Sequence, residues 1–143
     1  MRAFVGQYDH QMDEKGRVSL PSAFRRDAGT ERLVLVQWES SHVAVFPEEK
    51  WQEVVGRLLE YRRSDPKGWN RVRSIVGNAE EVSPDKQGRI LVPASLRESA
   101  GLSGAVMVCG NIDRIELWDP DRYETVVEKD ADDLSDFAHR LFG

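Results

Sequence analysis

The sequence contains an internal repeat with a constant offset. Residues 13–21 return as residues 85–93, an offset of 72 (85 − 13), and the two copies align without a gap. Each copy consists of an acid, two variable residues, glycine, arginine, three residues of strand character and proline. Such a duplication predicts two supersecondary units of the same design.

The similarity continues through the rest of each half. At the same offset the residue type, or its aromatic character, is kept in these pairs: Arg25 and Arg97, Ala28 and Ala100, Gly29 and Gly101, Val34 and Val106, Val36 and Val108, Phe46 and Trp118, Trp51 and Tyr123. Each unit is therefore predicted to contain a hairpin turn, a short helix, two strands and a closing helix.

The size of the unit restricts how it folds. A unit of about 40 residues buries too little apolar surface to be stable by itself. Two units packed about a pseudo-twofold axis would share a core and close their strands into a barrel, which removes exposed sheet edges. We therefore predict an α+β fold that is mainly β, with flanking helices.

Local patterns predict the strands of the first half. Residues 4–8 alternate between apolar and polar or small side chains, which indicates a first strand. Residues 33–36 and 43–46 are continuous apolar runs, which are typical of buried strands. Residues 39–42, between these runs, are predicted to form a hairpin loop.

Helices are predicted where start signals precede apolar residues at helical spacing. Pro21 and Gly29 suit the two ends of a short helix that buries Phe24 and Ala28. Further helices are indicated by the apolar stripes of residues 51–59 and 69–76, and by the Asp-Pro pair at 119–120.

These elements divide the chain into four parts. Residues 1–64 form the first repeat with its closing helix, and residues 65–79 form a linking helix. Residues 80–128 form the second repeat, and residues 129–143 form an acidic tail. The tail has a small apolar stripe (Leu134, Phe137, Ala138 and Leu141), so it would either fray or dock on a neighbouring subunit.

The repeated turn has a chemical logic of its own. Asp13 can accept hydrogen bonds from backbone N–H groups two or more residues ahead, and Gly16 tolerates positive φ. Arg17 follows as the next strand begins. In a single copy, a tight hairpin in which Asp13 pairs with Arg17 is as good an interpretation as a ligand-binding turn. The second copy favours two basic turns that face nucleic acid.

The net charge of −5 at first argues against a nucleic-acid partner. However, residues 116–143 contain nine acids and three Lys or Arg, a net charge of −6, which leaves +1 for residues 1–115. The acidity is concentrated at the C-terminal end, so the remaining surface can still present a basic face. Composition neither requires nor excludes DNA.

Other chemistries lack their usual residues. His10, His42 and His139 have no Ser or Cys partner in a catalytic pattern, and no phosphate loop or zinc spacing is present, so we expect no enzyme, metal or cofactor. Cys109 lies in an apolar run and is expected to be buried and unreactive. No apolar run is long enough to span a membrane, and we expect a cytoplasmic protein.

With both turns identified, the chain resembles the MraZ family of bacterial regulators. The matching segments are residues 8–10, 13–21, 85–93, 100–102 and 116–119, and the resemblance covers nearly the whole chain except about the last ten residues. It implies a fold related to AbrB-type regulators, with swapped hairpins forming a double-split β-barrel.

The resemblance also implies a function. Family members would form ring-like homo-oligomers and bind short direct repeats of double-stranded DNA in the promoter of the division and cell-wall gene cluster, at the nucleoid. The candidate DNA contacts are Lys15, Arg17 and Arg89, to which we add Lys86 from its place at the turn tip. Asp13, Gly16, Asp85 and Gly88 are expected to form the turns. Gln87 stands in the second copy where the first copy has Lys15. The alternative is an antitoxin-like protein-interaction module.

Overall fold

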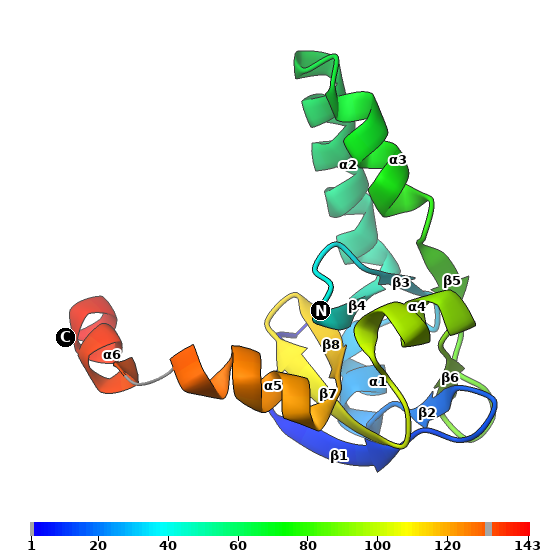
Figure 1. Ribbon diagram of the computed structural model, residues 1–143, viewed down its shortest axis with the longest axis vertical. Helices are drawn as coiled ribbons and strands as arrows, with labels where there is room; N and C mark the ends of the chain where they lie inside the picture. The colour runs from blue at the N-terminus through cyan, green and yellow to red at the C-terminus, as the bar shows by residue number, and fades with distance from the viewer. Residues whose placement is uncertain (1, 131–132) are drawn as a thin grey trace.

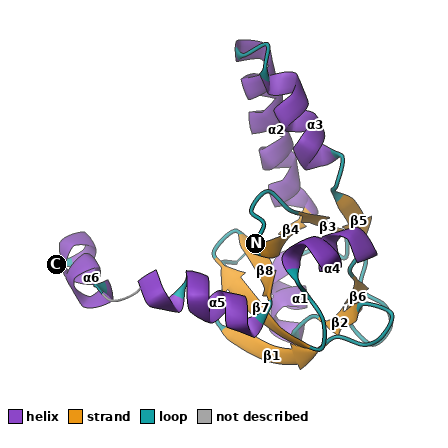
Figure 2. Ribbon diagram, in the orientation of Figure 1, coloured by secondary structure: helices purple, strands orange, loops and turns teal. Residues whose placement is uncertain are grey.

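The two repeats contribute strands to one shared antiparallel sheet (Figures 1 and 2). The computed structural model describes residues 2–130 and 133–143. The first repeat contains β1 (Gln7–Gln11), β2 (Arg17–Ser19), α1 (Ser22–Ala28), β3 (Leu33–Val36), β4 (His42–Pro47) and α2 (Glu48–Ser64). After α3 (Gly68–Val76) follow β5 (Glu80–Val82), β6 (Arg89–Leu91), α4 (Ala94–Ala100), β7 (Ala105–Asn111), β8 (Arg114–Trp118), α5 (Pro120–Val126), the 3₁₀ turn Glu128–Asp130 and α6 (Leu134–Phe142).

The strand order is symmetric about the centre of the sheet. It runs β1-β7-β8-β4-β3-β5, so that each strand of one repeat has its counterpart at the mirrored place. At the centre Ala44 faces Glu116, and in the separate two-stranded sheet Val18 faces Ile90. Both pairs join residues exactly one repeat apart, which places the predicted pseudo-twofold axis between them.

The repeats exchange strands across this axis. β1 of the first repeat pairs with β7 of the second, and β5 of the second pairs with β3 of the first. Between them β2 and β6 pair with each other in a short ribbon. The exchange confirms the predicted α+β class and the packing of two swapped repeats.

One part of the fold prediction is corrected. Among the described residues the strands form a six-stranded sheet and a separate two-stranded ribbon, with β1 and β5 at the edges, and do not close into one hydrogen-bonded barrel. The turn after β1 redirects the chain, so β2 pairs across the axis with β6 and not with β1. The ribbon closes the core by side-chain packing.

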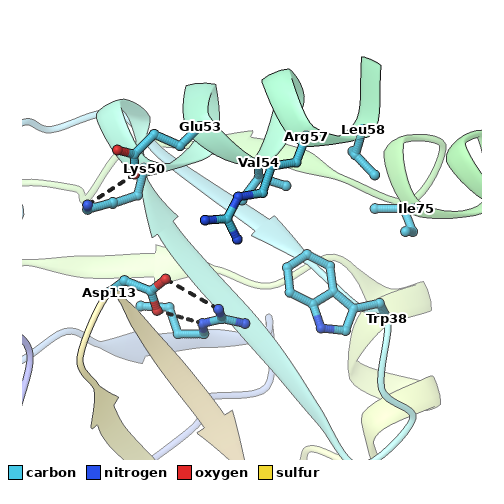
Figure 3. A pocket seen from close by; sticks show the side chains of 9 residues that line it. Trp38, Lys50, Glu53, Val54, Arg57, Leu58, Ile75 and Asp113 are labelled. Atoms are coloured by element: carbon cyan, nitrogen blue, oxygen red, sulfur yellow. Dashed lines mark hydrogen bonds and ion pairs between the residues drawn. The ribbon is translucent and has the colours of Figure 1, made fainter. Parts of the chain in front are cut away.

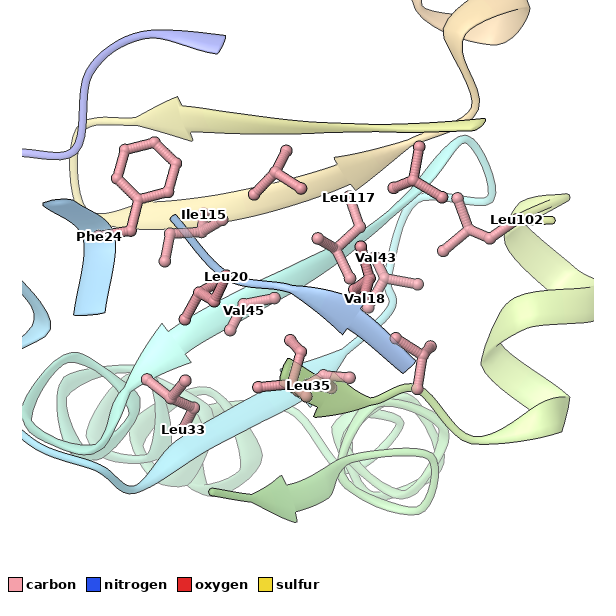
Figure 4. Close-up of a cluster of buried hydrophobic side chains, with 14 of the residues drawn as sticks. Val18, Leu20, Phe24, Leu33, Leu35, Val43, Val45, Leu102, Ile115 and Leu117 are labelled. Carbon is pink, nitrogen blue, oxygen red and sulfur yellow. The ribbon is translucent and has the colours of Figure 1, made fainter. Parts of the chain in front are cut away.

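The main core lies between the ribbon and the sheet (Figure 4). Val18 of β2 and Ile90 of β6 are fully buried and belong to the same apolar cluster as Val43, Val45 and Leu117. Burying each such side chain stabilises the fold by about 1.5–3 kcal/mol. The ribbon is therefore fixed to the sheet through its inner face, and its outer face is available for other contacts.

The opposite face of β4 packs against α2. Because successive strand residues alternate in direction, Ala44 and Phe46 point away from the main core and meet Trp51 and Val54. Both faces of β4 are thus covered, which explains its continuous apolar sequence. α2 and α3 form a hairpin that projects from this side of the sheet (Figure 1).

Two local predictions differ from the structure. The regular first strand begins at Gln7, whereas Phe4 forms an isolated bridge with Ile112, because Gly6 takes a φ of 95° between them. His42 was predicted in a loop but starts β4, where it is buried and stacks on Trp118 at 4.4 Å between ring centroids.

The helix ends follow the predicted signals. Gly29 ends α1 and Gly101 ends α4, both in the left-handed conformation. Asp119 caps α5 by accepting a hydrogen bond from the Arg122 N–H. The tail stripe lies on α6, and residues 131–132 of the predicted acidic tail fall outside the described residues. No described helix is long and apolar enough to cross a membrane.

Candidate nucleic-acid interface

The first turn is organised by the Asp13 carboxylate. Its Oδ1 accepts hydrogen bonds from the backbone N–H groups of Lys15 (3.0 Å) and Arg17 (2.9 Å). Its Oδ2 accepts from the Arg17 Nε at 2.6 Å. Gly16 takes a φ of 90°, which glycine adopts without a steric cost, and donates its N–H to the Asp13 carbonyl. The carboxylate therefore fixes both the turn and the arginine that follows it.

The second turn has the same hydrogen bonds. Asp85 Oδ1 accepts from the N–H groups of Gln87 (2.9 Å) and Arg89 (3.0 Å), and Oδ2 accepts from the Arg89 Nε at 2.9 Å. Gly88 takes a φ of 76°. In both turns the aspartate therefore pairs with the arginine, as the simple hairpin interpretation predicts. This pairing occupies only the Nε of each guanidinium group.

These hydrogen bonds change the acidity of the aspartates. The backbone N–H of Arg17 is the largest cause that lowers the pKa of Asp13, and the N–H of Arg89 does the same for the pKa of Asp85. Both carboxylates are therefore ionised near neutral pH and keep the arginine side chains in place.

The ribbon brings the two turns together. Val18 and Ile90 point into the core, so the residues on either side of them point outward. The register places Arg17 opposite Leu91 and Arg89 opposite Ser19, on one outer face. The Arg89 guanidinium lies 3.9 Å from the carboxylate of Asp13 in the other turn. The two turns and the outer side of the β2–β6 ribbon thus form one surface that carries Arg17 and Arg89, which we call the ribbon face.

Two further arginines reach the ribbon face from the helices. A Cβ added at Gly88 would lie 2.7 Å from Cζ of Arg25, and one added at Gly16 would lie 2.6 Å from Nε of Arg97. The arginine on the short helix of each repeat therefore covers the glycine in the turn of the other repeat. Arg25 also donates its Nε to the Leu20 carbonyl at 3.1 Å. The buried Nε of Arg97 has no hydrogen-bond partner among the described residues.

Arg25 was not among the contact candidates predicted from the sequence, although its side chain packs against the second turn. The sequence did contain a signal for this role: Arg25 and Arg97 stand one repeat apart, and both are arginine. The predicted lysines are placed differently. Lys15 and Lys86 are exposed at the turn tips, with no carboxylate of a described residue at ion-pair distance.

The two halves of the ribbon face are not equivalent. Each turn has two basic side chains, but Glu14 of the first turn stands where the second has Lys86, and Gln87 of the second stands where the first has Lys15. Ser19 of β2 corresponds to Leu91 of β6, which is 52% exposed. A partner would therefore meet different side chains on the two halves of the ribbon face.

A second polar cluster lies at the centre of the sheet. Glu116 receives hydrogen bonds from Asn111 and Trp118, and its carboxylate lies 3.2 Å from Nε2 of His42. Burial alone would raise the pKa of Glu116, but these hydrogen bonds outweigh burial and lower it to about 2. The described residues contain no group of three or more His, Cys, Asp or Glu arranged to hold a metal ion.

Comparison with known proteins places the chain in one family. The family model described as "MraZ protein, putative antitoxin-like" matches residues 3–68 and 75–143. The chain belongs to the MraZ family. The transcriptional regulator MraZ of Herpetosiphon aurantiacus is 33% identical over 138 residues, 96% of each chain. Those of Rhodococcus jostii and Acetivibrio thermocellus are 36% and 38% identical, over 92% and 85% of each chain. The resemblance inferred from the two turns is thus confirmed.

Proposed function

We propose that this MraZ family protein is a DNA-binding transcriptional regulator and that the ribbon face is its DNA-binding surface. The observation that supports this is the pair of arginines held by aspartates on one outward face. Arg17 and Arg89 each use Nε for the hydrogen bond to the turn aspartate. Among the described residues their terminal nitrogens make no hydrogen bond, although NH1 of Arg89 lies 3.9 Å from the Asp13 carboxylate. Two such nitrogens match the O6 and N7 acceptors of guanine in the major groove.

Affinity and specificity come from different residues in this proposal. Lys15 and Lys86 are exposed point charges and would neutralise phosphates, which gives salt-dependent affinity. Arg17 and Arg89 would contact base edges, each contact giving about 1–3 kcal/mol of discrimination. Arg25 and Arg97 would hold the turns from behind and add positive charge next to the DNA backbone.

A single ribbon face is small. It offers two base-contacting arginines, so one chain would recognise only a few base pairs. Several copies that bind neighbouring sites raise the effective concentration of each further contact. We therefore propose a ring-like homo-oligomer that binds short direct repeats in the promoter of the division and cell-wall gene cluster. The protein would act in the cytoplasm, at the nucleoid.

The test is DNA binding by Arg17→Ala, Arg89→Ala and the double variant, on repeat-containing and scrambled duplexes across a salt series. Each single variant should weaken specific binding by about tenfold to a hundredfold and reduce the preference for the repeat. Lys15→Ala should weaken binding to both duplexes and reduce the salt slope by about one.

Arg26→Ala is the matched control, because Arg26 is exposed, lies beside Arg25 and pairs with Asp27. It should bind DNA nearly as the unmodified chain does. If the double variant still prefers the repeat, the ribbon face is not the recognition surface.

The family description also names an antitoxin-like character, which favours a protein-interaction module as the second candidate. That candidate predicts a tight protein complex and no salt-dependent shift of any DNA. A binding assay with purified chain and promoter DNA separates the two, since only the regulator binds DNA without a protein partner.

A further inference from the structure

The outer side of the β2–β6 ribbon carries four side chains, one of which is apolar. The middle residue of each strand is buried, so the residues on either side of it point outward. These outward residues are Arg17, Ser19, Arg89 and Leu91. A single exposed leucine is common on protein surfaces. Leu91 is informative because it is 52% exposed on the surface that carries both candidate base-contacting arginines.

The strand register places Leu91 beside Arg17. The two residues lie directly opposite each other in the ribbon. The N–H of Val92 donates to the Gly16 carbonyl at 2.9 Å, which makes Gly16–Val92 a hydrogen-bonded pair and the next pair, Arg17–Leu91, a non-hydrogen-bonded one. In such pairs the Cβ atoms approach to about 4.5–5.5 Å on the same side of the sheet. Leu91 therefore flanks Arg17, although the two residues belong to different repeats.

The corresponding place on the other half of the ribbon is polar. Ser19 lies one repeat before Leu91 and stands opposite Arg89. The two guanidinium groups are also placed unequally. NH1 of Arg89 lies 3.9 Å from the Asp13 carboxylate, whereas among the described residues Arg17 makes no such contact with the second turn. The ribbon is therefore twofold in its backbone but not in the chemistry of its outer side chains.

A second place where apolar and cationic side chains meet is out of reach of DNA on the ribbon face. Trp38, Leu58 and Ile75 line a groove between α2 and the β7–β8 turn, together with cationic side chains (Figure 3). Ile75 packs on the face of β4 that α2 covers, whereas the ribbon packs on the opposite face. A duplex on the ribbon face would therefore meet Leu91 and not this groove.

We infer that Leu91 contacts the methyl group of a thymine in the base pair next to the guanine that Arg17 binds. The C5-methyl group of thymine is the apolar group that base edges present in the major groove. Base pairs are about 3.4 Å apart along the helix axis, so two side chains about 5 Å apart address neighbouring pairs. The hydroxyl of Ser19 both donates and accepts, so it restricts its own base pair less. The inference rests on the proposed function, because it requires the ribbon face to enter the major groove.

The same contact orients the chain on DNA. Phosphate contacts carry no sequence information. A ribbon with equal base-contacting halves would therefore bind a site in either of two orientations related by the pseudo-twofold axis. One orientation places Leu91 on the thymine, and the other places Ser19 there. Because only Leu91 gains an apolar contact with the methyl group, the first orientation is favoured, and Leu91 is a specificity-determining residue.

The first test replaces each thymine of a repeat-containing promoter duplex in turn by deoxyuridine, which removes the methyl group and keeps the base pairing. At one position the unmodified chain should bind about fourfold more weakly for each repeat bound, the factor that corresponds to one buried methyl group. Leu91→Ser should weaken binding to the original duplex at least as much, and deoxyuridine at that position should then cause no further loss.

Val5→Ser is the control for this test, since Val5 is 69% exposed and precedes β1, outside the ribbon. It should show the same deoxyuridine sensitivity as the unmodified chain. The inference is overturned if no thymine replacement weakens binding, or if Leu91→Ser stays sensitive to the same replacement.

The second test measures orientation. An iron chelate that cleaves DNA, attached to Arg26→Cys, marks the side of the second turn, because Arg26 is exposed and follows Arg25, whose guanidinium covers Gly88. The chain's own cysteine, Cys109, is buried. The labelled chain should cut mainly on one side of each repeat, and adding Leu91→Ser should make the cuts on the two sides more equal. An unchanged ratio of cuts would show that Leu91 does not orient the chain.

Failure of this inference is distinguishable from failure of the proposed function. If Arg17→Ala and Arg89→Ala reduce the preference for the repeat while deoxyuridine and Leu91→Ser have no effect, the ribbon face binds DNA and the thymine contact is wrong. If the double arginine variant keeps its preference for the repeat, the proposed function fails. A changed mass of DNA-free Leu91→Ser in light scattering would place Leu91 in a contact between copies, which also contradicts the inference.

Discussion

The contact between Arg25 and Gly88 joins the two repeats, and a substitution at Gly88 tests that contact quantitatively. Gly88 has a φ of 76°, and a Cβ there would lie 2.7 Å from Cζ of Arg25. Gly88→Ala therefore has two consequences: a strained backbone and a displaced guanidinium. Gly29→Ala is a matched control, because Gly29 has a φ of 70° and no atom within 4 Å of the added methyl group.

The two consequences have different magnitudes. The left-handed conformation costs an alanine about 1–2 kcal/mol, which applies equally at both glycines. Displacing Arg25 also removes its hydrogen bond to the Leu20 carbonyl, a loss of about 1 kcal/mol. Gly88→Ala should therefore lower the free energy of unfolding by about 2–3 kcal/mol, and Gly29→Ala by about 1–2 kcal/mol.

A double-mutant cycle isolates the contact. In an Arg25→Ala background the hydrogen bond is already absent, so Gly88→Ala should cost only the backbone strain, and the coupling should be about 1 kcal/mol. Urea unfolding of the four proteins measures it, and DNA binding at fixed salt reports the displaced guanidinium. If Gly88→Ala costs the same in both backgrounds, and no more than Gly29→Ala costs in the unmodified chain, Arg25 does not pack on the second turn.

Further predictions concern the core, pH and the cysteine. Phe24→Ala removes a 1% exposed ring that packs edge-on against Phe4. It should lower the free energy of unfolding measured in urea by about 3–5 kcal/mol. A loss under about 1 kcal/mol would contradict the place of Phe24 in the core. The pKa of Glu116 is lowered from 4.5 to about 2. Its contribution to the free energy of unfolding is therefore full above pH 4.5 and is lost as the pH falls toward 2. Glu116→Gln should flatten the pH dependence of unfolding in that window. Burial raises the pKa of Cys109 to about 12, so an alkylating reagent at pH 8 should modify it only after unfolding, and rapid labelling of the native protein would show that it is accessible.

Much of the candidate surface followed from the duplication. Two copies of Asp-x-x-Gly-Arg at one offset indicated paired turns, and the chemistry of Asp and Gly indicated their local geometry. The sequence did not reveal that Arg89 approaches Asp13, because that distance depends on the register of two strands that lie far apart in the chain. Whether these residues bind DNA stays a proposal for experiment.

Residues whose role depends on the other repeat were missed. Arg25 looks like an exposed helix residue when the first half is considered alone, and only strand exchange brings it over the second turn. His42 looked like a loop residue because polar neighbours precede it. Its position was decided by Trp118, which stacks on its ring, and by Glu116, whose carboxylate lies 3.2 Å from its Nε2.

By itself the sequence determined the local elements and their twofold duplication, because apolar spacing, proline, glycine and aspartate act over a few residues. It also determined the family through the two turns. Only the tertiary structure decided that the ribbon and the sheet remain separate and that both turns share one outward face. These features arise from pairing between segments about 70 residues apart, and such pairing is set by how two apolar faces pack, not by any local pattern.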